Sequence, residues 1–351
     1  MAFELSSDDT SADTLRCWLS PRLHARRAPG ARSRGDRILT IGLALTVAGA
    51  AVGLLGASAA TGSSPHNPVA TLRLHQTPST VAVGAGAVWV AEGGEGLFTT
   101  LARVNPKTNR VTTTFNVVQG ILSLAAGDGA VWVTNSESSS VDRVNPTRGS
   151  IVSSNQLGSG GVGDVAVGAG AVWATVSDPN NTVVRIDPAT VRSSPVANLG
   201  PATSTIAVGD GGVWVVNAQV GAVVRLDPST NQIVTSVPVQ NPDDVAVGAG
   251  GVWVTDPQDG AVLRIDPSTN RVVATAQAPG IAGGIAIAGG APWVNDTTDD
   301  TLLRIDPSTM QVSQTIRLSG PPNTIAGNAT TLWATDGTDN TLTRITVHAS
   351  S

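Results

Sequence analysis

The sequence predicts an all-β protein: a seven-bladed β-propeller of four-stranded antiparallel blades, closed by an N-terminal strand and preceded by one transmembrane helix. Three observations lead to this prediction. A tryptophan recurs seven times, a short pattern rich in glycine and proline turns repeats with it, and one uncharged apolar run precedes the repeats. Internal repeats of this length are typical of propellers and solenoids.

Seven of the eight tryptophans recur at intervals of 39 to 43 residues. Each is the largest apolar residue of a strand-like run such as Ala130–Asn135. We therefore interpret them as core residues that pack between blades rather than as platforms for a ligand. These tryptophans are Trp89, Trp132, Trp173, Trp214, Trp253, Trp293 and Trp333.

Each repeat contains four short apolar runs separated by turn residues, which predicts four strands. The first run, as in Val165–Gly168, leads into a Gly-x-Gly turn that favours a tight hairpin, and the second run carries the tryptophan. The third run ends in Arg-Ile-Asp-Pro or a close variant, whose aspartate can accept a hydrogen bond from the backbone N–H two residues on. The fourth run, such as Arg271–Thr275, follows a Ser-Thr-Asn turn.

The two ends of the repeat region predict how the ring closes. The seventh repeat, from Thr324 to about Ile345, supplies three strands, and Val69–Leu74 resembles an isolated fourth strand. Pairing these segments would complete the last blade, which the physics of unpaired sheet edges favours. We therefore expect residues 69–346 to form the propeller and residues 347–351 to form a C-terminal tail.

An arginine recurs in the third run of every repeat. A ring of seven arginines could bind an anion, but a residue that repeats with the blade more often contacts the neighbouring repeat. We therefore interpret these arginines as structural. They are Arg103, Arg143, Arg185, Arg225, Arg264, Arg304 and Arg344.

The runs Val-Trp-Val-Thr-Asn and Arg-Ile-Asp-Pro-Ser-Thr resemble the repeat of the YVTN-type propellers, a bacterial group close to NHL-repeat propellers and virginiamycin B lyase. The resemblance covers about residues 69–346 and implies a propeller, whereas the group includes both enzymes and proteins of unassigned role. Virginiamycin B lyase works with a histidine and a glutamate inside the ring plus Mg²⁺. Here the ring has only His75 and His348, at its two ends, so we expect no lyase activity of that type.

The N-terminal segment predicts a membrane anchor. Residues 1–37 contain seven arginines, and residues 38–60 contain no charge. A helix of that length spans about 34 Å, enough for a bilayer core of about 30 Å. Since the linker 61–68 has no Lys or Arg, the positive-inside rule places residues 1–37 in the cytoplasm and the ring outside the cell membrane. The alternative is secretion after signal-peptide cleavage near Ala59.

Binding residues are expected where loops gather at one mouth of the channel. The loops between second and third strands, and those leading into first strands, share one face and are rich in acidic residues. Such loops suit Ca²⁺ or Mg²⁺, although solvated acidic turns are ordinary. Our ligand or metal candidates are Asp164, Asp243, Asp244, Glu92, Glu95, Asp299 and Asp300.

Composition narrows the function classes. The chain carries 21 basic and 26 acidic residues, and the acidic excess lies in the ring, which argues against nucleic acid as a partner. The only cysteine, Cys17, lies in the basic tail, so the ring contains no disulfide. We expect a membrane-tethered, non-catalytic module that binds a protein or small-molecule ligand and needs no organic cofactor. The alternative is a metal-assisted lyase or hydrolase.

Overall fold

The computed structural model of the chain describes residues 69–93, 99–117, 120–158, 160–200 and 203–348. The chain divides into two units, Met1–Gly62 and Ser63–Ser351, and the ring belongs to the second. The predicted basic tail, apolar run and linker, together with Glu95, lie outside the described residues. Within the described ranges, no helix has the length and apolar character needed to span a membrane.

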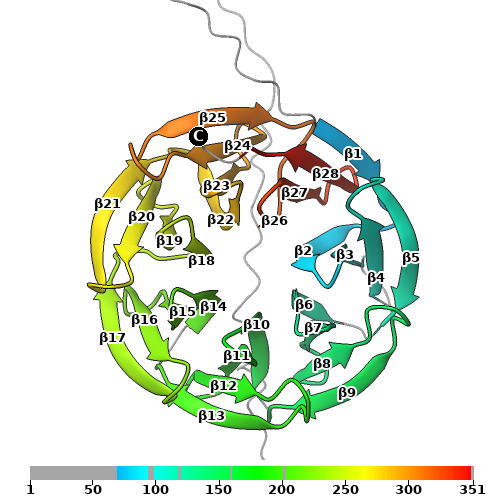
Figure 1. Ribbon diagram of the computed structural model, residues 1–351, viewed down its shortest axis with the longest axis horizontal. Helices are drawn as coiled ribbons and strands as arrows, with labels where there is room; N and C mark the ends of the chain where they lie inside the picture. The colour runs from blue at the N-terminus through cyan, green and yellow to red at the C-terminus, as the bar shows by residue number, and fades with distance from the viewer. Residues whose placement is uncertain (1–68, 94–98, 118–119, 159, 201–202, 349–351) are drawn as a thin grey trace, which may run out of the picture. The chain divides into compact units, whose positions relative to one another are not determined.

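Seven four-stranded antiparallel sheets surround a central axis as the blades of a propeller (Figure 1). In six blades the strands follow chain order, with the first strand at the axis and the fourth at the circumference. Blades one to three are β2 (Pro78–Gly84), β3 (Ala87–Glu92), β4 (Thr100–Asn105) and β5 (Arg110–Asn116); β6 (Ile121–Gly127), β7 (Ala130–Asn135), β8 (Ser140–Val144) and β9 (Ile151–Gln156); and β10 (Gly161–Gly168), β11 (Ala171–Ser177), β12 (Thr182–Ile186) and β13 (Ser193–Asn198).

Blades four to six have the same plan. They are β14 (Thr203–Gly209), β15 (Gly212–Asn217), β16 (Ala222–Asp227) and β17 (Gln232–Pro238); β18 (Val245–Gly248), β19 (Gly251–Asp256), β20 (Ala261–Asp266) and β21 (Arg271–Gln277); and β22 (Ile281–Ala288), β23 (Ala291–Asp296), β24 (Thr301–Ile305) and β25 (Val312–Arg317).

The seventh blade combines the two ends of the ring. Its inner strands are β26 (Ile325–Gly327), β27 (Thr331–Asp336) and β28 (Thr341–Thr346), and its outer strand is β1 (Val69–Arg73). The β1–β28 register runs antiparallel from Val69 opposite Ile345 to Arg73 opposite Thr341. Leu74, directly after β1, is 6% exposed and packs in the same cluster as Trp333. The last blade therefore has four strands, like the others.

The core lies between blades. Each repeated tryptophan has no exposed surface and clusters with strands of a neighbouring blade. Trp214 packs with Val252 and Val254 of blade five, and Trp333 packs with Val88 and Val90 of blade one. Because a fully buried aromatic side chain is worth several kcal/mol, these contacts supply the main force that holds the blades in a ring.

Tight hairpins join the first and second strands. In the first of them Ala85 and Gly86 both have positive φ, 47° and 75°, as the type I′ turn requires. The indole N–H of Trp89 donates to the carbonyl of Gly84 at 3.1 Å and so fixes this turn. A Cβ at Gly84 would lie 2.2 Å from the carbonyl oxygen of Ala126, so glycine lets the inner strands of blades one and two approach each other.

The repeated arginine lies directly opposite the tryptophan on the next strand, as in Trp214 and Arg225. The guanidinium of Arg225 sits 5.1 Å from the centre of the indole ring, a cation–π contact. Its Nη1 donates to Asn270 of the next blade at 2.6 Å, and its Nη2 donates to the carbonyl of Gly211 at 3.2 Å. The arginine therefore links the turn of its own blade to the turn of the neighbour.

Deleting residues 69–75 should destabilise the ring. The last blade would keep three strands and lose the core contacts of Leu74, a loss that alone costs about 2–5 kcal/mol. At about 2–4 °C for each kcal/mol, the melting temperature should fall by about 5–15 °C and the protein should aggregate through the open edge. Thermal denaturation of the full chain, followed by circular dichroism, measures the change.

Deletion of the linker residues 61–67 is the matched control, since it removes the same number of residues without removing a strand. If both deletions melt like the intact chain, the pairing of β1 with β28 does not hold the ring together.

Candidate functional site

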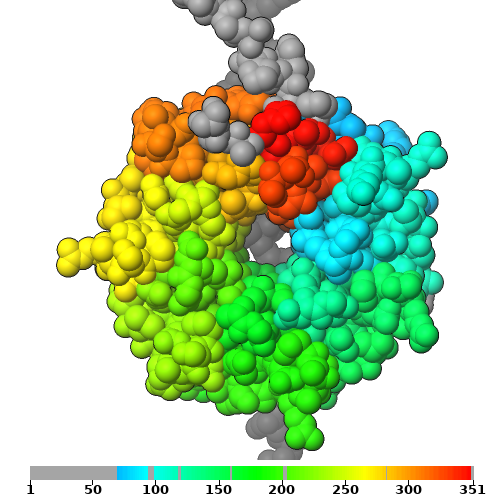
Figure 2. Space-filling view, viewed as in Figure 1, coloured from blue at the N-terminus to red at the C-terminus, as the bar shows by residue number. Residues whose placement is uncertain are grey.

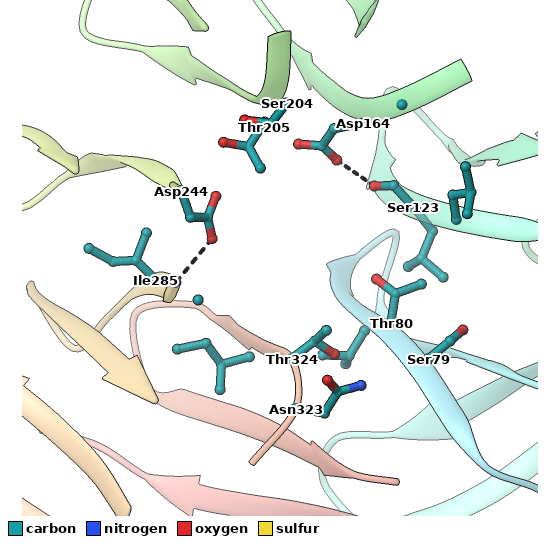
Figure 3. A pocket seen from close by; sticks show the side chains of 16 residues that line it. Ser79, Thr80, Ser123, Asp164, Ser204, Thr205, Asp244, Ile285, Asn323 and Thr324 are labelled. Carbon is teal, nitrogen blue, oxygen red and sulfur yellow. Dashed lines mark hydrogen bonds between the residues drawn. The ribbon is translucent and has the colours of Figure 1, made fainter. Parts of the chain in front are cut away.

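A cavity of about 430 Å³ opens at the channel, where the first strands begin (Figure 3). Figure 2 shows one face of the ring with an opening at its centre. Each blade contributes the residue that directly precedes the Val-Ala, Leu-Ala or Ile-Ala pair of its inner strand. In blade order these residues are Thr80, Ser123, Asp164, Thr205, Asp244, Gly284 and Thr324.

Two aspartates interrupt this set of small and hydroxyl side chains. Asp164 is half-buried in the cavity wall, and its Oδ1 accepts hydrogen bonds from Ser123 Oγ at 2.5 Å and from the backbone N–H of Val165 at 2.8 Å. Its Oδ2 accepts the backbone N–H of Ile206 at 2.9 Å. The carboxylate of Asp164 therefore connects blades two, three and four.

Asp244 repeats this arrangement two blades further on. Its Oδ1 accepts the N–H of Val245 at 2.8 Å, and its Oδ2 accepts the N–H of Ile285, in blade six, at 3.1 Å. Thr205 lies between the two aspartates (Figure 3), and its Oγ1 donates to the carbonyl of Asp243 at 3.3 Å. Hydrogen bonds thus tie blades two to six together around the mouth.

The two carboxyl groups resist ionisation. Burial in the cavity wall raises the pKa of Asp244 to about 7, and the negative charges of Asp164 and Asp243 contribute to the increase. The N–H groups of Ile285 and Val245 act in the opposite direction, since they stabilise the carboxylate. Burial also raises the pKa of Asp164 and of Asp243.

Asp243 stands beside this cavity rather than in its wall. The residue as a whole is exposed, but its carboxyl group packs against Gly283 of the next blade, which leaves no room for a Cβ there and partly removes the carboxyl group from water. The structure therefore brings three of the predicted acidic residues, Asp164, Asp243 and Asp244, to the mouth.

The other candidates lie elsewhere. Asp299 and Asp300 belong to the turn between β23 and β24 and do not line the cavity. Glu92 is completely buried at the end of β3, where its Oε2 accepts the backbone N–H groups of His75 at 3.2 Å and Gln76 at 3.1 Å. Burial raises the pKa of Glu92, and its contacts give it a role in holding the loop that leads into blade one.

Sequence reasoning missed most of the cavity wall. Ser123, Thr205, Thr80 and Thr324 share the register position of Asp164, and that position in the repeat was the signal that would have identified them. Leu122 was missed as well, although it is 53% exposed and lines the mouth. The wall thus combines hydroxyls, two carboxyls and one exposed apolar side chain.

The described residues of the wall include no histidine, cysteine, lysine or arginine. Among the residues that the structure describes, no three side chains of His, Cys, Asp or Glu come together as metal ligands. The expectation that Ca²⁺ or Mg²⁺ binds at these loops stays a prediction.

No protein-family model and no curated protein matches the sequence. Solved structures match in fold. A catalytically inactive histidine-to-alanine variant of virginiamycin B lyase from Staphylococcus aureus, in a structure with quinupristin, is 18% identical, with a TM-score of 0.66 over 80% of this chain and 99% of that chain. In fold, the chain is a virginiamycin B lyase-like propeller.

Two propellers of other kinds are equally similar. Kuenenia stuttgartiensis hydrazine synthase is 13% identical, with a TM-score of 0.67 over 80% of this chain and 98% of that chain. The β-propeller domain of Myceliophteria thermophila Cps50 (Swd1) is 10% identical, with a TM-score of 0.66 over 79% of this chain and 98% of that chain. At these identities the likeness establishes the fold alone, and the YVTN-type and NHL assignment stays a prediction.

The protonation of Asp244 should make stability depend on pH. Between its ordinary pKa of 3.8 and its folded pKa of about 7, the folded state keeps a proton that the unfolded chain has released. The free energy of unfolding should therefore fall as pH rises from 5 to 8, by at most about 3 kcal/mol, since one pKa unit corresponds to about 1.36 kcal/mol and the fall levels off above the folded pKa. Urea unfolding at several pH values measures it.

Asp244→Asn should flatten this dependence, whereas the exposed control Asp299→Asn should retain it. Equal pH dependence in the Asp244→Asn variant and the unaltered chain would contradict the assignment to Asp244.

Proposed function

We propose that this protein is a non-catalytic binding module, that its ligand or partner binds at the channel mouth, and that residues 38–60 tether it with the ring outside the cell membrane. The observation that carries the proposal is the cavity itself. It is concave, its wall combines apolar and polar side chains, and the position that Asp164 and Asp244 occupy in the wall carries different residue types in different blades. Binding sites in folded proteins have these properties.

The chemistry of the wall supports binding over catalysis. The hydroxyl nearest to a carboxylate, Ser123 Oγ, already donates to Asp164, and Asp164 is held in turn by the N–H groups of Val165 and Ile206. A nucleophilic serine needs a base that accepts its proton and releases it again in each catalytic cycle, most often a histidine. The wall has none.

A metal-assisted lyase or hydrolase is the second candidate, and the fold shared with virginiamycin B lyase is the observation that favours it. We predict no such activity, because the wall offers no histidine as general acid or base. The full chain, incubated with virginiamycin B or quinupristin and Mg²⁺, should give no linearised product above background by mass spectrometry. The Staphylococcus aureus lyase serves as the active control. Turnover that Asp244→Asn abolishes would overturn the prediction.

The location and the binding surface can be tested with one variant, Leu122→Cys. The ring has no cysteine of its own, and Leu122 is exposed at the mouth. A membrane-impermeant maleimide that carries a photo-crosslinker should label this cysteine on intact spheroplasts. Illumination should then give a covalent adduct with the bound ligand or partner, detected by mass spectrometry.

Cys17 is the internal control for topology, because the proposal places it in the cytoplasm, where the reagent reaches it only after permeabilisation. Val273→Cys is the control for the binding surface, because Val273 is 54% exposed on the outer strand β21. Labelling of Cys17 but not of Leu122→Cys on intact spheroplasts would overturn the topology. Identical adducts at both ring positions would overturn the channel mouth as the binding surface.

A further inference from the structure

We propose that the acidic side of the channel mouth binds the primary ammonium group of an organic amine, held between Asp164 and Asp244. This assignment rests on the proposed function, since it names the class of ligand for the same cavity.

The first argument is the number of hydrogen-bond acceptors that remain free. A carboxylate offers about four lone-pair sites. Asp164 uses three of them, for Ser123, Val165 and Ile206, and Asp244 uses two, for Val245 and Ile285. About three sites are left, and an ammonium group has three N–H donors to fill them.

A buried acceptor without a partner lies beside Asp244. Asn295 is 2% exposed, and its amide nitrogen donates to the carbonyls of Pro322 and Asn323 at 3.1 and 2.9 Å. Its Oδ1 has no hydrogen-bond partner, and it faces the position where Gly284 lacks a side chain, 3.0 Å from where a Cβ would be. Gly284 lines the cavity next to Asp244. This side of the mouth therefore has an excess of acceptors over donors.

Charge leads to the same conclusion. The wall contains two carboxyl groups and no basic side chain, so ionisation of both leaves two like charges without a counter-charge. A cation between them removes that repulsion.

The rest of the wall selects an organic cation over a metal ion. Leu122, which is 53% exposed, and the half-buried Ile325 supply apolar surface in the wall, which suits an alkyl chain. Ca²⁺ takes six to eight oxygen ligands, and Mg²⁺ needs six in near-ideal octahedral geometry, some of them water. The described residues place no third acidic side chain in the wall, and the two that are there already accept five hydrogen bonds.

Three probes of similar size separate the possible causes of binding. Butylammonium has charge and three N–H donors, butyltrimethylammonium has charge without N–H donors, and butanol has neither. At millimolar concentration, butylammonium should raise the melting temperature of the full chain by about 2 °C or more, and the other two should not. Nα-acetyl-lysinamide, compared with butylammonium, distinguishes a lysine side chain of a protein from a free amine as the source.

The effect should grow between pH 6 and pH 8, because the pKa of Asp244 is about 7 and binding requires its carboxylate, next to Asp164 and Asp243. The alkylammonium group stays protonated throughout this range.

Asp164→Asn and Asp244→Asn should each abolish the stabilisation by butylammonium, measured against the melting temperature of the same variant without ligand. Asp299→Asn, with the same loss of charge outside the cavity, should keep it. Thr205→Val leaves both carboxyl groups in place and removes the hydroxyl between them. It should weaken the effect even if an aspartate variant fails to fold.

An equal shift with butyltrimethylammonium, a larger shift with Ca²⁺ or Mg²⁺, or full retention in the Asp164 and Asp244 variants would overturn the amine assignment. If the amine fails while Leu122→Cys still gives a specific adduct, the ligand class is wrong and the proposed binding surface stands. If the amine has no effect and Leu122→Cys gives no specific adduct, the amine assignment and the proposed function are both wrong.

Discussion

The whole ring depends on one contact, the repeated tryptophan buried between neighbouring blades with an arginine opposite it on the next strand. The indole provides apolar burial toward the neighbour, as Trp214 does toward Val252 and Val254. The arginine forms a hydrogen bond across the same interface between blades, as Arg225 does with Asn270. The tryptophan and the arginine hold the blades together jointly, because a blade is a single sheet and each of its two faces must be covered by a neighbouring blade. The regular spacing of the tryptophans is therefore a direct consequence of the architecture.

A packed ring of this kind fixes the geometry of its mouth. All seven inner strands surround the same channel, so the residue before the Val-Ala, Leu-Ala or Ile-Ala pair of each blade faces one cavity whatever its identity. Those positions make few demands on packing and are free to vary. Thr80, Ser123, Thr205 and Thr324 keep a hydroxyl, while Asp164 and Asp244 introduce charge. The residues that stabilise the ring thus stay the same from blade to blade, whereas the residues that differ between blades are concentrated where a ligand could reach them.

The parts of this structure that repeat could be predicted from the sequence, and the parts that do not repeat could not. Periodic tryptophans and Gly-x-Gly turns predicted seven blades and their hairpins, and Asp227 accepts the N–H of Ser229 at 2.7 Å, as its turn motif indicated. The acidic residues were harder to place. In the sequence, Asp299 and Asp244 both stand in loops. Only their position relative to the inner strand shows that Asp299 is a turn residue and Asp244 a cavity residue. Ser123 was missed because its hydroxyl, taken alone, resembles that of any other serine in the chain; only its place in the repeat, which it shares with Asp164, would have identified it.

Not every interface between blades is joined by an aspartate. Blades six and seven are linked at the same level by the neutral amide of Asn295, which donates to the carbonyls of Pro322 and Asn323. An uncharged side chain can therefore join two blades by hydrogen bonds, without the free-energy cost of burying a carboxylate. Burial of the carboxyl groups of Asp164 and Asp244 does have this free-energy cost, and the raised pKa values of both groups reflect it. Because the next interface between blades is joined without a carboxylate, the two aspartates support the proposed ligand site in the mouth more than a purely structural role.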